Sequence, residues 1–485
     1  MSAKYAQVVV IGAGIAGLAS AIRLARRGFY VMAFEAGAGP GGKMAEIRSH
    51  GFRFDTGPSL FTLPHLVEEL LDKDFGKNYR RLELVTRYFW EDGTVLDAWA
   101  DPDRFAAAVE SLLGEPAKKV LAYLDEARFL YEHTAGMFIF NPVTRLSTIF
   151  SSEGIRALKA LPRLKAFRSM HRENEHWFSS EKLIQLFDRF ATYNGSNPYL
   201  APATLTMIAH LEHNLGAWFP EGGMHQIAAN LEAKARSLGV EFHYNEPVNE
   251  ILMDGRIAKA VKTSHDFYPA DIVVSDVDIS HVYGNMLPGK PLPLRYSNKT
   301  PSTSALIFYW GIRRTSPMLD LHNILFSRDY KSEFEALMEG TLARDLTVYI
   351  FISSKVVPGD APVGCENWFA MVNAPFDRGQ DWESLRTHAR RLILEKVKKV
   401  LGMDLEPDIV FEDYADPPLI AQRTGSWRGA LYGISSNDPM AAFMRHPNKV
   451  RDFYNLYFVG GSVHPGGGIP LCLASALIVD KLIHK

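Results

Sequence analysis

Three glycines near the start of the chain have the spacing of a dinucleotide-binding turn. Gly12, Gly14 and Gly17 form a GxGxxG pattern directly between an apolar run and a helical pattern. In such a turn the first glycine permits the sharp bend, the second lets backbone approach a pyrophosphate, and the third lets the helix pack against the strand. The helix N-terminus then faces the phosphates, so the chemistry indicated is the binding of a dinucleotide.

Glu35 extends this pattern, because it ends the next apolar run 18 residues after Gly17. A carboxylate at that place accepts hydrogen bonds from ribose hydroxyls and disfavours a 2′-phosphate. Ala13, Ile15 and Ala16, between the glycines, belong to the same predicted binding loop. The alternative is a glycine-rich turn followed by a surface glutamate.

A second glycine-rich loop, AGAGPGGKM, follows Glu35 directly and contains Gly41, Gly42 and Lys43. A simple NAD dehydrogenase does not need this loop, whereas flavoproteins of the glutathione-reductase-like class carry one to hold the longer FAD. No second GxGxxG stands between a strand and a helix, so the sequence does not predict a built-in NAD(P)H reductase domain. We therefore predict FAD, with oxygen, a quinone or another carrier as the electron acceptor.

The elements that must position this site begin as a strand–helix–strand unit. Residues 7–11 and 30–34 are short apolar runs, and residues 14–27 between them have helical spacing of apolar side chains. Such runs indicate buried parallel strands joined by a helix. Residues 221–275 and 453–485 again combine a glycine-rich loop with predicted strands and a helix, as expected for further parts of a nucleotide-binding domain.

The intervening stretches look different, since residues 65–220 show mostly helical patterns. Three runs alternate like the strands of a second sheet: 303–312, 347–353 and 367–373. A chain of 485 residues exceeds one ordinary core, so two domains are expected. We predict an α/β chain, α+β overall, with a discontinuous glutathione-reductase-like Rossmann domain for FAD and a mixed-sheet and helical substrate domain. The predicted boundaries are 1–70, 221–290 and 450–485 for the FAD-binding domain, and 71–220 and 291–449 for the substrate domain.

Composition narrows the class of protein further. The formal net charge of −2 gives no reason to expect a nucleic-acid partner. The two cysteines, Cys365 and Cys472, form no CxxC pair, which favours a reducing compartment. The N-terminus leads straight into a predicted strand, and no window approaches 18 consecutive apolar residues. We expect a cytoplasmic protein that is soluble or peripherally bound to a membrane.

Several longer motifs resemble the bacterial phytoene desaturase family of FAD-dependent carotenoid desaturases. They are VVVIGAGIAGLASAIRLA, EAGAGPGGKM, GFRFDTGPSLFT, YNGSNPYLAPATL, WFPEGGMHQIAANL and NLYFVGGSVHPGGGIPLCLASA, and they span essentially the whole chain. The combination of FRFDTGPSLFTLP with GGSVHPGGGIP is most similar to the branch that acts on hydroxylated acyclic carotenoids, the 1-hydroxycarotenoid 3,4-desaturases. The resemblance implies an apolar carotenoid substrate.

The resemblance also implies which residues hold successive parts of FAD. Gly42 and Lys43 would line the phosphate and ribityl region, where the family commonly has Arg instead of Lys, so the bidentate contact is lost. The backbone of Val248 would meet the adenine. The isoalloxazine would lie against two groups of residues: Gly57, Pro58 and Ser59 in one turn, and Gly460, Gly461, Gly468, Ile469 and Pro470 in the other.

Desaturation removes a hydride and a proton from adjacent carbons, and FAD can take the hydride. A final helix from Ile469 would direct its N-terminal dipole at the flavin. His464 could act as a base, or it could only fix its loop by hydrogen bonding. Asp55 is expected to be a turn or cap residue rather than an acid. His210 and His213 stand three apart, but we predict no metal site there.

A basic and apolar segment could give access to a membrane. The segment expected to meet the membrane is residues 128–172. In its part 145–172, seven basic residues occur with a single acidic one, and the basic residues are Arg145, Arg156, Lys159, Arg163, Lys165, Arg168 and Arg172. Interleaved apolar side chains would contact acyl chains while Arg163, Lys165 and Arg168 meet anionic headgroups. The alternative is an amphipathic helix that packs on the core and exposes a solvated basic face.

Other functions fit the same motifs. A carotenoid isomerase or oxygenase of this fold would share the flavin site, and a flavin amine oxidase would need a small cage for an amine. A flavin-free lipid-binding chaperone could share the architecture, although the complete GxGxxG, Glu35 and the C-terminal glycine loop argue against it. The mass of the product and the colour of the purified protein would separate these possibilities.

Overall fold

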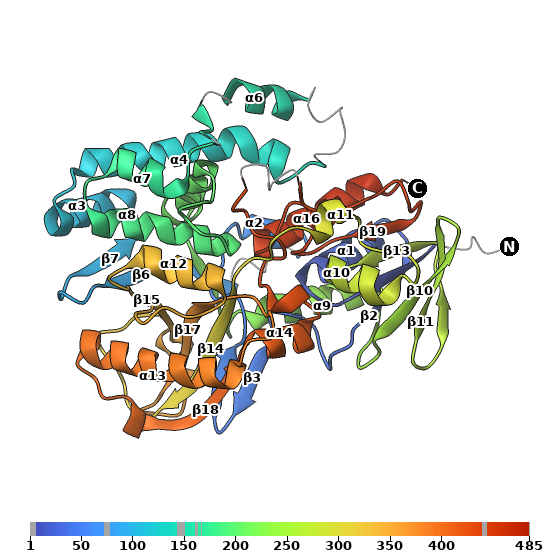
Figure 1. Cartoon of the computed structure of the whole chain (residues 1–485). Coiled ribbons are helices and arrows are strands. Elements are labelled where there is room, and N and C mark those ends of the chain that lie inside the picture. The colour runs from blue at the N-terminus through green and yellow to red at the C-terminus, as the bar shows by residue number, and fades with distance from the viewer. Residues whose placement is uncertain are drawn as a thin grey trace.

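Two β-sheets organise the chain, one on each side of the view in Figure 1. The computed structural model describes residues 6–71, 78–142, 151–160, 163–165, 167–438 and 444–484. The sheet that carries the glycine motif is drawn from residues 7–34, 241–275 and 456–458, whereas the larger sheet is drawn from residues 84–99 and 304–415. These segments fall within the two predicted domains, whose boundaries stay a prediction.

The sheet of the glycine motif has five parallel strands. In order across the sheet they are β19 (Leu456–Phe458), β13 (Ile272–Ser275), β1 (Gln7–Ile11), β2 (Tyr30–Phe34) and β9 (Glu241–His243). Val8 and Val10 of β1 pack with helices, whereas Val9 and Ile11 pack with a small antiparallel sheet. Burial on both faces explains why the apolar runs are continuous rather than alternating.

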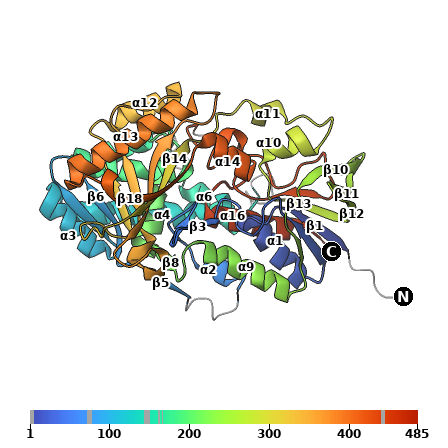
Figure 2. The same cartoon turned by 90° about the horizontal axis from the view of Figure 1, so that it is seen from below.

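Three helices cover one face of this sheet, and the first of them packs against the other two (Figure 2). They are α1 (Ile15–Arg26), α9 (His225–Ser237) and α16 (Ile469–Leu482). The antiparallel sheet on the other face consists of β10 (Val248–Asp254), β11 (Ile257–Thr263) and β12 (Phe267–Pro269). The predicted Rossmann unit is therefore confirmed in its strand–helix–strand order.

The larger sheet has seven strands, antiparallel except where β15 runs parallel to β6. Across the sheet they are β18 (Ile409–Ala415), β14 (Ser304–Ile312), β17 (Glu366–Ala374), β16 (Val348–Phe351), β15 (His322–Leu325), β6 (Leu84–Phe89) and β7 (Val95–Trp99). The second sheet expected from residues 303–312, 347–353 and 367–373 is present. Its strand β14 has no exposed face, because α13 (Trp382–Leu401) covers the side that carries Phe308 and Trp310.

The mostly helical pattern expected for residues 65–220 is wrong for residues 79–99. There the chain forms β5 (Tyr79–Arg81) and then the hairpin of β6 and β7. Asp92 and Gly93 lie in the hairpin turn, where Gly93 has a φ of +85° that favours glycine. Turn chemistry and cross-strand pairing outweigh the helical spacing of the apolar side chains.

Strands β6 and β7 form one edge of the seven-stranded sheet, and a layer of helices lies beyond that edge (Figure 1). It consists of α3 (Pro102–Leu113), α4 (Ala117–Phe138), α6 (Ser152–Ala160), α7 (Met170–Trp177), α8 (Glu181–Asp188), η3 (Arg189–Asn194), η4 (Ala203–Met207) and η5 (His210–Leu215). Helix α6 packs on α4 at the periphery.

Short elements connect these layers. The strands are β3 (Glu46–Ser49), β4 (Phe52–Asp55) and β8 (Trp218–Pro220). The helices are α2 (His65–Glu68), α10 (Ile279–His281), η6 (Val282–Met286), α11 (Leu294–Ser297), α12 (Tyr330–Glu339), η7 (Ser353–Lys355), η8 (Pro358–Asp360), η9 (Glu406–Asp408), α14 (Pro417–Thr424) and η10 (Trp427–Gly429).

Candidate active site

A cavity of about 1580 Å³ joins the glycine motif to the seven-stranded sheet. Pockets for one drug-sized ligand measure roughly 300–1,000 Å³, so this cavity has room for a dinucleotide and a second large molecule. Most of the predicted cofactor residues line it: Gly12, Gly14, Ile15, Ala16, Glu35, Gly41, Gly42, Lys43, Gly57, Pro58, Ser59, Val248, Gly461, Gly468, Ile469 and Pro470.

Three of the predicted cofactor residues, Ala13, Gly17 and Gly460, lie just behind this lining and hold it through backbone hydrogen bonds. The amide of Ala13 donates to Glu35 (2.8 Å) and that of Gly17 to Asp276 (2.8 Å). The amide of Gly460 donates to Ser475 Oγ (2.9 Å). These residues support the wall of the cavity.

The glycine turn has the geometry that a dinucleotide needs. Gly12 has a φ of +96°, and a Cβ at Gly17 would lie 2.0 Å from the Gly12 carbonyl oxygen. The bend and the close packing of helix on strand therefore both require glycine. Gly14, the N-cap residue of α1, provides no side-chain cap, and the Asp276 carboxylate accepts the Gly17 amide at this helix N-terminus, where an anion would bind.

A second helix N-terminus meets the same cavity. Helix α16 begins at Ile469 after Gly468, which has a φ of +101° and provides no side-chain cap. Pro470 occupies its first turn, where the missing amide hydrogen is not needed. Gly468, Ile469 and Pro470 all line the cavity. Two helix N-termini at one cavity fit a cofactor that carries a pyrophosphate and an electron-accepting ring.

Glu35 and Lys43 both line the dinucleotide cradle and are held by backbone groups. The Glu35 carboxylate accepts the amides of Ala13 and Gly37, each at 2.8 Å. Lys43 Nζ donates to the carbonyl oxygens of Ala430 and Leu431, at 3.1 and 2.9 Å. Burial lowers the pKa of Lys43, and the negative charge of nearby Asp278 opposes this shift.

Asp276 was not singled out from the sequence. Its carboxylate accepts the Gly17 amide and lies where a Cβ on Gly14 would approach Oδ2 to 2.5 Å. Burial raises the pKa of Asp276 to about 7, although the Gly17 hydrogen bond favours the charged form. The residue directly follows β13, and ligands of parallel sheets bind beyond the carboxyl ends of strands. That rule could have identified it.

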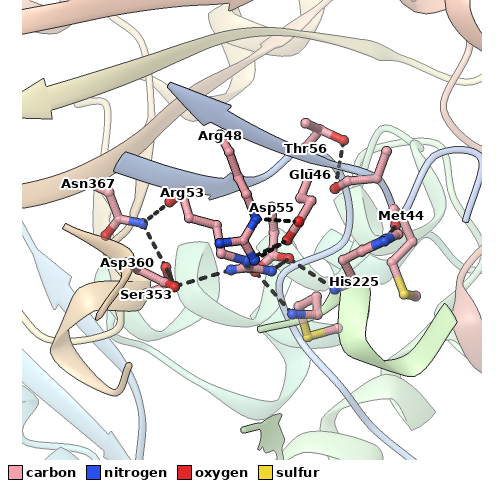
Figure 3. A network of polar contacts seen from close by, with 12 residues as sticks. Met44, Glu46, Arg48, Arg53, Asp55, Thr56, His225, Ser353, Asp360 and Asn367 are labelled. Carbon is pink, nitrogen blue, oxygen red and sulfur yellow. Dashed lines mark hydrogen bonds and ion pairs between the residues drawn. The ribbon is translucent and has the colours of Figure 1, made fainter. Parts of the chain in front are cut away.

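A buried ion-pair network lies around β4, which precedes the Gly57–Ser59 turn in the chain (Figure 3). Arg53 on β4 pairs with Glu46 (2.6 Å), Asp55 (2.5 Å) and Asp360 (3.1 Å). Asp55 also accepts the amides of Met224 and His225, each at 3.0 Å, at the start of α9. The geometry agrees with a cap residue, as expected for Asp55, and joins β4 to α9 and to η8.

Beyond this turn the cavity becomes an apolar chamber. Ile307, Phe369 and Met371 of the seven-stranded sheet line one wall. Phe138 near the end of α4 and Ile208, next to η4, line another. Carbon-lined walls of this kind suit a hydrocarbon ligand.

His464 does not line this cavity. It is buried, its Nε2 lies 3.0 Å from the carbonyl oxygen of Asn141, and burial lowers its pKa to about 4. The geometry favours the expected loop role over a base that acts on substrate. His210 contacts Asn214 and His213 stacks on Phe105, and no metal-binding cluster occurs among the described residues.

The three cations expected at a membrane are paired with acids. Arg163 pairs with Glu126 of α4, and both Lys165 and Arg168 pair with Glu173 of α7. The side chains of Arg145 and Lys159 lie outside the described residues. In the described part of the chain, no helix combines the length and the apolar character needed to span a bilayer.

Comparison with known proteins identifies the family. The model of flavin-containing amine oxidoreductases matches residues 15–479. The chain belongs to this family. It is 45% identical to a 1-hydroxycarotenoid 3,4-desaturase from a Flavobacterium species, over 98% of this chain and 99% of the relative. It is 32% identical to a 4,4'-diapolycopene oxygenase from a Methylomonas species, over 98% of each.

A solved oxidoreductase from Methanosarcina mazei shares the fold, with a TM-score of 0.64 and 17% identity over 98% of this chain and 100% of the other. The predicted fold class is confirmed, as is the resemblance to carotenoid desaturases. The protein is an FAD-dependent oxidoreductase, which excludes the flavin-free chaperone.

Proposed function

We propose that the protein introduces the C3–C4 double bond into an acyclic carotenoid that carries a hydroxyl group on C1. The supporting observation is that one cavity contains both the dinucleotide cradle and an apolar chamber. The 45% identity to the Flavobacterium 1-hydroxycarotenoid 3,4-desaturase extends over the whole of this arrangement. Because the chamber lies beyond the Gly57–Ser59 turn, a substrate there would meet the flavin ring.

In this reaction FAD, when bound, accepts a hydride from one carbon while the adjacent carbon loses a proton. The chain's own residues would bind the cofactor and the substrate, orient them and exclude water from the reacting bond. The N-terminus of α16 favours negative charge at the cofactor ring, and the apolar wall excludes water from the reacting bond. The pair of Arg53 and Asp55 fixes the end of β4, which leads into the Gly57–Ser59 turn against which the cofactor would lie.

The electrons must then pass to an external acceptor, for which we propose oxygen or a quinone. The chain has no second GxGxxG between a strand and a helix that would serve a nicotinamide cofactor. Per double bond formed, the substrate loses two hydrogens and the acceptor gains two electrons and two protons.

We also propose that the substrate enters from a membrane surface near Leu164. Leu164 lines the cavity, and neighbouring Phe167 is 91% exposed. An exposed aromatic side chain can insert among acyl chains, whereas the paired cations contribute less than free ones would. The contact would therefore depend mainly on apolar burial.

The test is incubation of FAD-loaded protein with 1-hydroxylated carotenoid in liposomes, followed by mass analysis of the products. Desaturation lowers the mass by two hydrogens per double bond, isomerisation leaves it unchanged and oxygenation raises it. A Gly14→Val variant, which crowds the dinucleotide cradle, is the control for flavin dependence. An unchanged or raised mass with the unaltered protein would overturn the proposal.

A further inference from the structure

A chain of polar side chains begins at the flavin turn and enters the apolar chamber. Ser59 Oγ lies 2.6 Å from Tyr349 Oη, which in turn lies 2.8 Å from His322 Nδ1. All three residues line the cavity. The chain therefore connects the turn expected beside the isoalloxazine with strands β15 and β16 of the seven-stranded sheet.

His322 ends this chain with an unused ring nitrogen. It is 2% exposed, and its Nε2 has no hydrogen-bond partner among the described residues. Burial lowers the pKa of His322 to about 3, and the charge of Arg189 shifts it in the same direction. The imidazole is therefore neutral, and Nε2 can donate or accept one hydrogen bond according to its tautomer. A purely hydrocarbon ligand would leave this nitrogen unsatisfied.

A second polar group lines the same cavity and limits what the ligand can be. Arg189 donates to Tyr193 (3.0 Å) and to Tyr88 (2.6 Å), and it lies 3.4 Å from Glu212. The charges of Arg189 and Glu212 compensate each other, so this wall carries no net charge. A neutral hydroxyl group suits such a wall, whereas an ionised ligand would be buried without a counter-ion.

We propose that His322 binds the hydroxyl group of the substrate and that Tyr349 and Ser59 are positioning residues for it. This inference rests on the proposed function. A hydroxyl on C1 lies within about 5 Å of the C3–C4 bond, given single bonds near 1.5 Å. That bond must reach the flavin ring, so the group that recognises the hydroxyl must stand near the ring turn. The chain from Ser59 to His322 meets this condition.

A purely structural role would not need the second ring nitrogen of His322. The bond between Ser59 and Tyr349 already joins the flavin turn to β16, and one imidazole nitrogen suffices to continue it. Recognition of a hydroxyl predicts something that a structural role does not, namely a preference between two carotenoids that differ by one oxygen atom.

The experiment compares an acyclic C1-hydroxylated carotenoid with its 1,2-dihydro analogue, which has the same carbon skeleton but lacks the hydroxyl. Kd and kcat/KM are measured for both on full-length, FAD-loaded protein. The variants are His322→Phe and Tyr349→Phe, with His322→Gln to restore a hydrogen-bonding group. Tyr309→Phe is the matched control, because Tyr309 lines the same cavity but its hydroxyl donates to the carbonyl of Thr56 (3.1 Å).

We expect the unaltered protein to prefer the hydroxylated carotenoid by about 100-fold or more, because a site built for a hydroxyl rejects its analogue strongly. His322→Phe should lower this preference at least about tenfold, Tyr349→Phe should lower it less, and His322→Gln should retain more of it than His322→Phe. Tyr309→Phe should change both substrates alike. FAD content, measured from the flavin absorbance, shows that each variant is folded.

Equal binding of the two carotenoids, or a preference that survives His322→Phe, would overturn the hydroxyl site while leaving desaturation intact. If instead no carotenoid loses mass, the proposed function fails, and the ratio of the two Kd values still tests the hydroxyl site. If His322→Phe loses FAD, Tyr349→Phe is decisive instead, because a preference that it leaves unchanged would overturn the hydroxyl site.

Discussion

At the scale of single residues, Asp276 connects proton binding to cofactor binding. Its carboxylate accepts an amide at the N-terminus of α1, where the pyrophosphate of a dinucleotide would bind. The pKa of Asp276 is raised from 3.8 to about 7. Between these values the folded protein binds more protons than the unfolded chain, so the unfolding free energy falls as pH rises and the loss is complete above about 7.

This pKa predicts how FAD affinity depends on pH. A bound pyrophosphate adds negative charge and raises the pKa of Asp276 further, so FAD binding takes up a proton and weakens as pH rises above about 7. We expect Asp276→Asn to flatten this dependence and to bind FAD about tenfold more tightly at pH 8. The measurement is the Kd from quenching of flavin fluorescence between pH 6 and 9.

Asp271→Asn is the matched control, since Asp271 precedes the other end of β13 and accepts the amide of Gln7 (2.8 Å). It should keep the pH dependence of the unaltered protein. Parallel profiles for the unaltered protein and Asp276→Asn would show that Asp276 does not sense the cofactor.

At the scale of elements, the network around Arg53 joins β4 to α9 and to η8. Replacement of Asp55 by Ala would leave the buried Arg53 with a missing partner and would free two amides at the start of α9. We expect a loss of about 3–5 kcal/mol in the unfolding free energy, measured by urea denaturation. Glu232→Ala, which removes a half-exposed pair with Arg236 on the same helix, should cost about 1 kcal/mol or less. Equal losses would contradict the network's role.

The hairpin of β6 and β7 shows why some elements resist prediction from local patterns. Its apolar residues have helical spacing in part, but Asp92 and Gly93 favour a turn, and β15 offers β6 a parallel partner. That partner is more than 200 residues away in the chain, as the register of Asn323 with Arg87 shows. A long-range pairing of this kind leaves no trace in a local window.

At the scale of the whole molecule, the proposed membrane contact depends on an apolar side chain more than on charge. Phe167 is exposed beside Leu164, whereas Arg163, Lys165 and Arg168 are paired with acids. Burying one large apolar side chain contributes about 1.5–3 kcal/mol. We expect Phe167→Ala to weaken binding to anionic liposomes about tenfold in a sedimentation assay.

The control for this prediction is Phe267→Ala. Phe267 is 55% exposed on β12, in the small sheet that lies away from α6 in Figures 1 and 2. It should leave liposome binding unchanged. If Phe267→Ala weakens binding and Phe167→Ala does not, the membrane face lies on the opposite side of the molecule.

The cofactor cradle was predictable from the sequence because its geometry is local. The turn from Gly12 to Gly17 and its link to Glu35 involve one strand, one helix and the next strand. The spacing of these residues therefore predicts which of them would contact the phosphates. The same holds for the start of α16, where Gly468 and Pro470 mark the helix N-terminus. Fold class and FAD followed from such motifs, whereas the carotenoid-type substrate was implied by the family resemblance.

Only the tertiary structure decided what surrounds the substrate. Ser59 meets Tyr349 across 290 positions, Arg53 meets Asp360 across 307, and His464 turns away from the cavity toward Asn141. The basic side chains of residues 163–168, which were expected to face a membrane, form ion pairs with acidic side chains on α4 and α7. No local charge pattern reveals these partners. The physical reason is that a buried polar atom takes its partner from whichever segment packs against it, and packing is a property of the folded chain as a whole.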